Sequence, residues 1–154
     1  MSGRFFAALI LLSLLTGCAS VTGSNIQTLK IEAKMADGTM VEGADCELVN
    51  ELGKFRVTTP GYVNVRRSFS NLKINCIKSG MPAANGTGKP TPNVGMFGNI
   101  LIGGLVGVTV DHVRGAGYSY PEWMQMVFGK YLLFNRLDDH DDQPSLGIEQ
   151  TVYR

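Results

Sequence analysis

Apolar and polar residues alternate regularly over the part of the chain that follows residue 25. Leu29, Ile31 and Ala33 fall on one side of an extended chain, and Lys30 and Glu32 fall on the other. A period of two with one apolar side is typical of a half-buried β-strand. The same alternation returns at Ala44, Cys46, Leu48, Phe55, Val57, Val63, Val65, Leu72, Ile74 and Cys76, with turn signals at Asp37-Gly38 and Pro60-Gly61. The pattern predicts a small β domain over residues 26–80.

The first residues of the chain have a different character. Arg4 precedes an apolar run, Phe5 to Leu15, which is shorter than the roughly 20 residues needed to span a bilayer. A basic residue, a short apolar run and small residues after it are the three parts of a secretory signal. The sequence therefore predicts that residues 1–17 are a signal peptide that ends at a lipidated cysteine. An ordinary short membrane anchor, or a plain secreted protein whose Cys18 is incidental, are the alternatives.

The end of that run, Leu15-Thr16-Gly17-Cys18, has the form Leu-small-Gly-Cys. It resembles the lipobox of bacterial lipoproteins, and the resemblance implies that Cys18 is lipidated, with palmitate among its acyl chains, and becomes the new N-terminus. Ala19 follows the cysteine, which in such proteins implies the outer membrane, facing the periplasm, rather than the inner membrane or the cell surface. Residues 18–25 then read as a polar tether between the lipid and the β domain.

Lipidation of Cys18 leaves two cysteines, Cys46 and Cys76, each on the apolar side of its predicted strand. In an oxidising compartment such a pair favours a disulfide, which would stabilise a domain of this size by about 3–4 kcal/mol. Two buried free thiols are the alternative. A redox-active role is not expected, because the chain has no Cys-x-x-Cys spacing.

Within the same region, Glu42-Gly43-Ala44 precedes a strand, and Thr59-Pro60-Gly61 precedes a closing pair of strands. This arrangement resembles the PEGA-type and carboxypeptidase-regulatory-like β-sandwich modules, although Val41 stands where their motif has proline. The resemblance covers about residues 26–80. It implies a small Ig-like sandwich with a role in envelope adhesion or assembly and with no active site of its own.

Residues 81–93 are rich in Pro, Gly, Asn and Thr and are interpreted as a linker. Next, over residues 94–117, glycines that include Gly95, Gly103 and Gly107 recur at multiples of four residues. On a helix this spacing forms one stripe of small residues against which another backbone can pack closely. The stretch therefore predicts a glycine-zipper-like helix that packs in a membrane, on a partner or with itself, and it resembles the zippers of envelope proteins. A helix packed on the soluble domain, or glycine-rich loops, are the alternatives.

The distal part, residues 118–154, combines an aromatic segment with an acidic tail. Trp123 to Phe128 is a dense apolar group that is interpreted as core packing, with a membrane-interface belt as the alternative. The run Asp138 to Asp142 lacks the spacing of a calcium loop and reads as solvated charge. Asp111 and His112 have no nucleophile at a supporting spacing, so neither a metal site nor a catalytic site is expected.

Composition adds few constraints. The net charge of +1 gives no electrostatic reason to expect nucleic acid as a partner, and the glycine-rich run at residues 86–91 lacks the residues of a nucleotide-binding loop.

The expected fold class is α+β, mainly β: a disulfide-bonded Ig-like or PEGA-like sandwich followed by a glycine-rich helical segment. The expected function is that of a lipid-anchored envelope lipoprotein, neither an enzyme nor a cofactor carrier, with a structural or protein-interaction role through an envelope partner or self-association. The alternative is a membrane-active protein whose glycine zipper oligomerises in a bilayer or perturbs it.

Overall fold

The computed structural model describes residues 25–92, 117–138 and 142–151. Strands form wherever the alternating pattern places apolar side chains on one face, and short turns containing Gly, Asp or Pro separate most of them. The elements in chain order are β1 (Ile26–Lys34), β2 (Asp45–Asn50), β3 (Gly53–Thr58), β4 (Gly61–Arg66), β5 (Leu72–Ile77), β6 (Ala84–Lys89), β7 (Thr91–Pro92), β8 (Tyr118–Ser119), β9 (Trp123–Val127), β10 (Tyr131–Asn135), the 3-10 turn η1 (Arg136–Asp138) and β11 (Gly147–Glu149).

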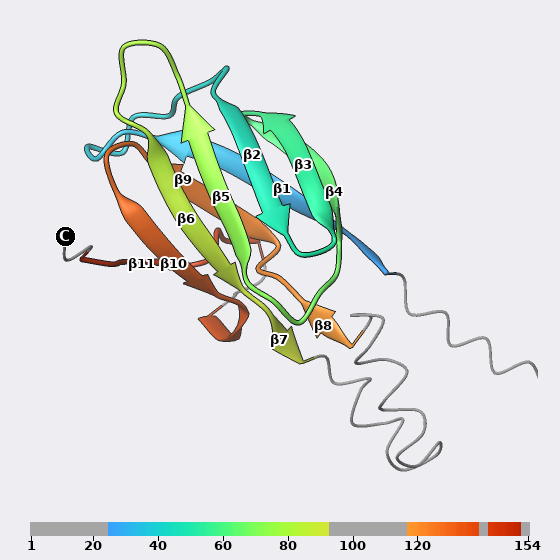
Figure 1. The fold of residues 1–154 in the computed structure, drawn as a ribbon. Coiled ribbons are helices and arrows are strands. Elements are labelled where there is room, and N and C mark those ends of the chain that lie inside the picture. Colours follow the sequence, from blue (N-terminus) through green and yellow to red (C-terminus); the bar gives the residue numbers. More distant parts are fainter. Residues whose placement is uncertain (1–24, 93–116, 139–141, 152–154) are drawn as a thin grey trace, which may run out of the picture.

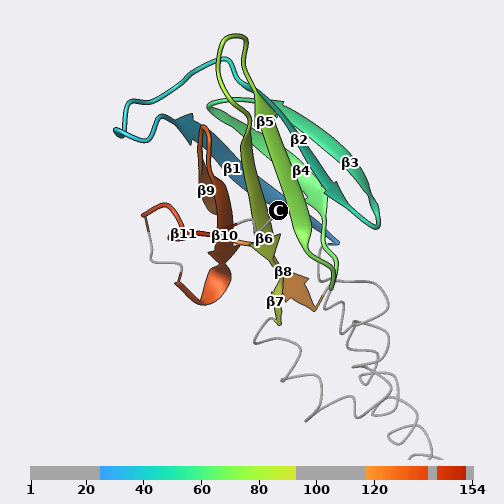
Figure 2. The ribbon, with the colours of Figure 1, turned by 60° about the vertical axis from the view of Figure 1, so that its left-hand side comes forward.

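Two sheets pack face to face around one core (Figures 1 and 2). One is a three-stranded sheet with the order β4-β1-β9, and the other is a six-stranded sheet with the order β11-β10-β6-β5-β2-β3. A short ribbon, β7-β8, lies at one end. The largest fully buried aliphatic side chains of the core are Leu29, Ile31, Leu48, Leu72, Met124 and Met126.

The fold class expected from the sequence is wrong in its helical component. The described residues form a mainly β structure with mixed sheets and contain no α-helix. The helix that the glycine spacing predicted over residues 94–117 lies, apart from Gly117, outside the described residues. The helical component was inferred from glycine spacing alone, and a four-residue spacing describes one face of a helix only where a helix forms, while glycine itself is a poor helix former.

The β domain is also larger than residues 26–80. Strand β9 joins the three-stranded sheet by parallel pairing with β1, and β10 joins the six-stranded sheet by parallel pairing with β6. The turn between β9 and β10 contains Gly129 at φ +80°, so two strands that are consecutive in sequence enter different sheets. The segment interpreted as an aromatic segment and tail thus supplies strands to both layers, and its apolar residues Met124 and Met126 are fully buried, as the core-packing interpretation predicted.

The expected linker, residues 81–93, differs from the structure in a similar way. Its residues Ala84–Lys89 form β6, which lies between β5 and β10 in the six-stranded sheet. Gly86 and Gly88 face inward, and a Cβ on Gly86 would lie only 2.8 Å from Met126 Cε. These glycines therefore let the methionines of the opposite sheet approach the strand backbone, which explains why a strand here has a loop-like composition.

The predicted disulfide is present. Cys46 and Cys76 lie directly opposite each other on the antiparallel strands β2 and β5, with their Cα atoms 4.0 Å apart. Both are buried in the core. The bond therefore crosslinks neighbouring strands of the six-stranded sheet.

A buried polar clamp closes the end of the sandwich where β1 begins. The side chain of Gln27 accepts a hydrogen bond from the Tyr120 backbone N–H (2.9 Å) and donates one to the Tyr120 carbonyl (2.8 Å). The phenol of Tyr120 donates to the Ser70 carbonyl (2.8 Å), and burial raises its pKa. Because β8 lies just before Tyr120, the β7-β8 ribbon is held beside the start of β1 (Figure 1).

Candidate functional site

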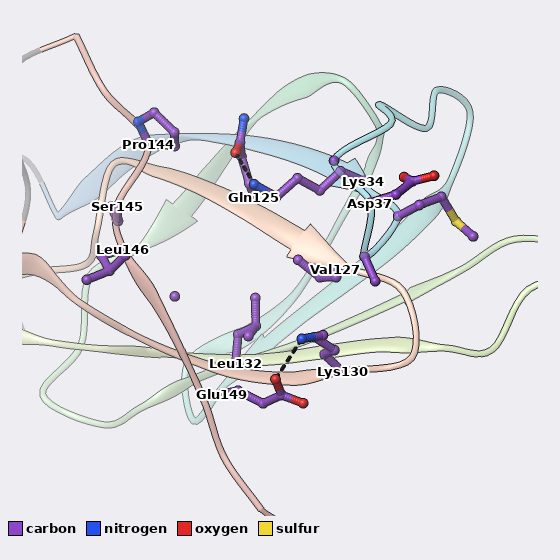
Figure 3. Close-up of a pocket in the computed structure, with 14 residues that line it drawn as sticks. Lys34, Asp37, Gln125, Val127, Lys130, Leu132, Pro144, Ser145, Leu146 and Glu149 are labelled. Atoms are coloured by element: carbon purple, nitrogen blue, oxygen red, sulfur yellow. Dashed lines mark hydrogen bonds and ion pairs between the residues drawn. The ribbon is translucent and has the colours of Figure 1, made fainter.

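A pocket opens where β9 forms the edge of the three-stranded sheet (Figure 3). Its walls come from the end of β1 and the turn after it, from β9 and the start of β10, and from the segment that leads into β11. Its volume is about 460 Å³, within the range of pockets that hold small ligands or single side chains with their backbone. We call it the β9 pocket; it is lined by Lys34, Met35, Ala36, Asp37, Gly38, Gln125, Val127, Lys130, Leu132, Pro144, Ser145, Leu146, Gly147 and Glu149.

The pocket is lined by both apolar and charged side chains. Val127 and Leu132 are buried side chains of the interior, and Leu146 is 64% exposed at its mouth. On the rim, Lys130 forms an ion pair with Glu149 at 2.7 Å. Lys34 donates to the side chain of Gln125 at 2.9 Å, and among the described residues it has no carboxylate within ion-pair distance. The rim thus presents one cation whose charge is not paired.

A hydrogen-bond network on the outer face of the three-stranded sheet holds Gln125 and Lys34 in place. Glu32 Oε2 accepts from Trp123 Nε1 (2.9 Å) and from Gln125 Nε2 (2.8 Å), and Oε1 contacts the Lys30 ammonium (2.9 Å). The same ammonium lies 3.6 Å from the centroid of the Trp123 ring, a cation–π contact. The Gln125 amide is therefore fixed at both ends, by Glu32 and by Lys34, so that this part of the pocket wall is ordered before any ligand arrives.

The electrostatics of Glu32 agree with a supporting role. Burial alone raises the pKa of this carboxyl, but the hydrogen bonds from Gln125, Lys30 and Trp123 outweigh burial and leave the pKa below its usual value. A carboxylate whose pKa is lowered and whose oxygens are already engaged by donors is a poor proton acceptor for catalysis. Glu32 is therefore an anchor for its neighbours.

The backbone of β9 also faces the pocket. Lys30 N–H donates to the Glu122 carbonyl and Phe128 N–H donates to the Lys34 carbonyl, in register with the parallel β1–β9 ladder. In such a ladder, alternate residues of β9 direct their backbone groups toward β1, and Trp123, Gln125 and Val127 direct theirs to the open side. On that side Ser145 N–H donates to the Trp123 carbonyl and Lys130 N–H to the Val127 carbonyl. Within the part of the chain that the structure describes, the N–H and C=O of Gln125 have no partner.

No group of three or more His, Cys, Asp and Glu side chains is close enough to hold a metal ion in residues 25–92, 117–138 and 142–151. In the same ranges no helix is long and apolar enough to cross a membrane.

A second hollow of about 470 Å³, lined by residues that include Glu47, Arg56 and Asn75, lies on the outer face of the six-stranded sheet. In it Glu47 forms an ion pair with Arg56 at 3.2 Å.

Of the residues singled out from the sequence, only the two cysteines are brought together in the structure. The lipobox Leu15-Thr16-Gly17-Cys18 and the glycines Gly95, Gly103 and Gly107 lie outside the described residues, as do residues 139–141 of the acidic run. The β9 pocket was not anticipated, because its lining comes from three distant stretches of the chain. One local signal pointed to this region of the chain. Trp123, the only tryptophan, and Gln125 are two positions apart and would therefore face the same side of a strand.

Comparison of the chain with protein-family models, with curated proteins and with solved structures gave no match.

Proposed function

We propose that this protein is a lipid-anchored envelope lipoprotein that acts as a non-catalytic binding module. The lipid on Cys18 would hold it in the outer membrane, facing the periplasm, and the β9 pocket would present a binding site to an envelope partner. The lipobox-like sequence supports the anchor. The Cys46–Cys76 disulfide supports an oxidising compartment.

One observation carries the binding role: the tethered end and the pocket lie at opposite ends of β1. Asn25, the first described residue after the tether, precedes β1, and its carbonyl accepts a hydrogen bond from Arg67 N–H. Lys34 ends the same strand on the pocket rim (Figures 1 and 3). A strand rises about 3.3 Å per residue, so β1 separates the two by roughly 25 Å. An anchored domain built in this way directs its pocket away from the lipid.

The alternative, a membrane-active glycine-zipper protein, has weaker support. Pro92 and Tyr118, which flank the glycine-rich stretch, are paired neighbours in the β7-β8 ribbon. A single bilayer crossing would separate its two ends by about 30 Å. The paired flanks therefore favour a role at the membrane surface or against a partner.

The anchor is tested by fractionation of cells that carry the intact chain. We expect labelled palmitate to enter the wild-type protein and the protein to sediment with the outer membrane, whereas Cys18→Ala abolishes labelling and releases the protein. Ser20→Ala serves as the matched control and should behave as wild type. Unlabelled wild-type protein, or a Cys18→Ala variant that stays in the membrane fraction, would refute the lipoprotein assignment.

The binding role is tested by photo-crosslinking in intact cells. A photoreactive amino acid in place of Leu146 at the pocket mouth should give a discrete crosslinked product. The matched control is Leu137, which is similarly exposed (76% against 64%) but does not line the pocket. Equal products from both positions, or none from Leu146, would argue against the pocket as the contact site.

A further inference from the structure

We infer that the β9 pocket binds a short extended peptide, which pairs its backbone with Gln125 and places one apolar side chain in the pocket. This inference rests on the proposed binding role and specifies its ligand. Three features of the pocket carry it: a stretch of strand edge that no described residue pairs with, a hollow beside that edge lined in part by apolar side chains, and a rim cation without a carboxylate partner among the described residues.

The open edge determines how the backbone of the ligand pairs with the protein. Unpaired N–H and C=O groups of one residue on an edge strand match the two groups that one residue of an antiparallel neighbour supplies. The edge is closed on either side of Gln125, by Ser145 at Trp123 and by Lys130 at Val127. Only a short segment fits between these two contacts, which excludes addition of a full-length strand or of a broad sheet edge.

The hollow determines the side chain. Leu146 supplies exposed apolar surface next to the open edge, beside the buried side chains of Val127 and Leu132, and the volume of about 460 Å³ accommodates one large aliphatic or aromatic side chain together with its backbone. Side chains of an extended ligand alternate in direction, so that one enters the pocket while its neighbours point outward.

The rim determines the preferred charge. Lys130 is neutralised by Glu149, but the Lys34 ammonium is bound only to the neutral amide of Gln125 among the described residues. An acidic residue or a terminal carboxylate on the peptide can therefore form an ion pair with Lys34. We expect preference for a peptide that carries one negative charge beside its apolar residue.

The test uses five capped pentapeptides, acetyl-Thr-Thr-X-Thr-Glu-amide, in which X is Val, Ile, Leu, Met or Phe. Each is titrated into the ¹⁵N-labelled mature chain carrying Cys18→Ala, and the backbone amide signals are followed by NMR. At least one peptide should shift the amides of Gln125 and Val127 saturably. Two main-chain hydrogen bonds and one buried side chain predict a dissociation constant on the order of 0.1–1 mM.

Two matched changes isolate the backbone pairing. N-methylation of X removes the ligand's donor while keeping its side chain, and it should weaken binding at least tenfold. In the protein, Gln125→Pro removes the edge N–H, which an edge strand tolerates, whereas Gln125→Ala removes the side chain alone. The proline variant should bind at least tenfold more weakly than the alanine variant, as judged by the Val127 amide.

Three outcomes would overturn the inference: no peptide shifts the Gln125 amide, the N-methylated peptide binds as well as its parent, or the Gln125 amide shifts with protein concentration alone. The last would assign the edge to a second copy of the chain. Because the test uses the form without lipid, its failure leaves the membrane assignment standing. Failure of the fractionation test, in turn, does not affect the peptide site.

Discussion

The two outer faces of the sandwich use their charged residues differently. On the six-stranded sheet, Glu47 pairs with Lys54 at 3.6 Å and with Arg56 at 3.2 Å, and both basic side chains are largely exposed. On the three-stranded sheet, Glu32 is 8% exposed and is bound by donors from β1 and β9. Exposed pairs contribute little to stability, whereas a buried carboxylate with several donors fixes its neighbours. The difference indicates that Glu32 holds the side chains around it more firmly than Glu47 does.

The six-stranded sheet instead carries the disulfide, and we expect its removal to have the largest effect on stability. Replacing both Cys46 and Cys76 by Ala should lower the free energy of unfolding by about 3–4 kcal/mol, because the bond closes a loop across 30 residues of sequence. Urea denaturation of the mature Cys18→Ala form measures it. A loss below about 1 kcal/mol would contradict a structural role for the bond.

Close packing between the sheets predicts the next largest effect. Gly86→Ala places a Cβ 2.8 Å from Met126 Cε and 3.1 Å from Phe134 Cε2, so the side chains of the core must shift. We expect a loss of about 1–3 kcal/mol in unfolding free energy. Lys89→Ala, at the exposed end of the same strand, is the control and should change stability by less than about 0.5 kcal/mol.

A direct comparison of the two carboxylates follows. Glu32→Gln keeps the shape of the side chain but gives its donors a weaker acceptor, and we expect a loss of about 1–3 kcal/mol. Glu47→Gln, on the exposed face, should cost much less, because exposed ion pairs contribute little to stability. Equal losses in urea denaturation would remove the distinction between the two faces.

The pH dependence gives the smallest but most specific effect. Hydrogen bonds from Gln125, Lys30 and Trp123 outweigh burial and lower the pKa of Glu32 below 4.5, the value expected for the unfolded chain. The ionised group therefore stabilises the fold above that pH, and its contribution is lost as the pH falls through the lower pKa of the folded state. The stability difference between wild type and Glu32→Gln should shrink below pH 4.5.

Added salt should affect the pKa values of Glu32 and Glu47 differently. The hydrogen bond from Arg56 and the charge of Lys54 lower the pKa of Glu47. Because Glu47 is the more exposed of the two carboxylates, added salt should return its pKa toward the usual value while moving that of Glu32 less. Carboxyl carbon NMR titrations at about 0.02 M and 0.5 M salt measure both shifts in one sample. Equal salt responses would indicate that Glu32 is as accessible to solvent as Glu47.

The sequence predicted the local structure better than the long-range pairing. Alternation identified β1, β2 and β5, and the apolar positions of Cys46 and Cys76 placed them for a disulfide. The alternating pattern does not reveal the strand at Ala84–Lys89, because two of its inward positions are glycines. Glycine is needed there because a methionine of the opposite sheet packs against the strand backbone. Contacts of that kind are absent from any local window of sequence.

The pocket was missed for a related reason. Lys34 and Gln125 are 91 positions apart in the chain and meet only because β9 pairs in parallel with β1. Gln27 shows a similar limit, since it occupies an apolar-side position of β1 and is buried as a clamp for the Tyr120 backbone. A polar residue on the apolar side of a predicted strand indicates a distant partner, but the sequence does not say which one.

The position of β1 has a mechanical consequence. It is the central strand of its sheet, with β4 antiparallel on one side and β9 parallel on the other. Tension between a tether attached before Asn25 and a load held near Lys34 would act along the strand axis. Where Gln125 of β9 holds the load, the force passes from β1 to β9 through the hydrogen bonds of their ladder, which are then strained in shear together rather than peeled apart in succession. A domain connected in this way resists being pulled from either end of β1.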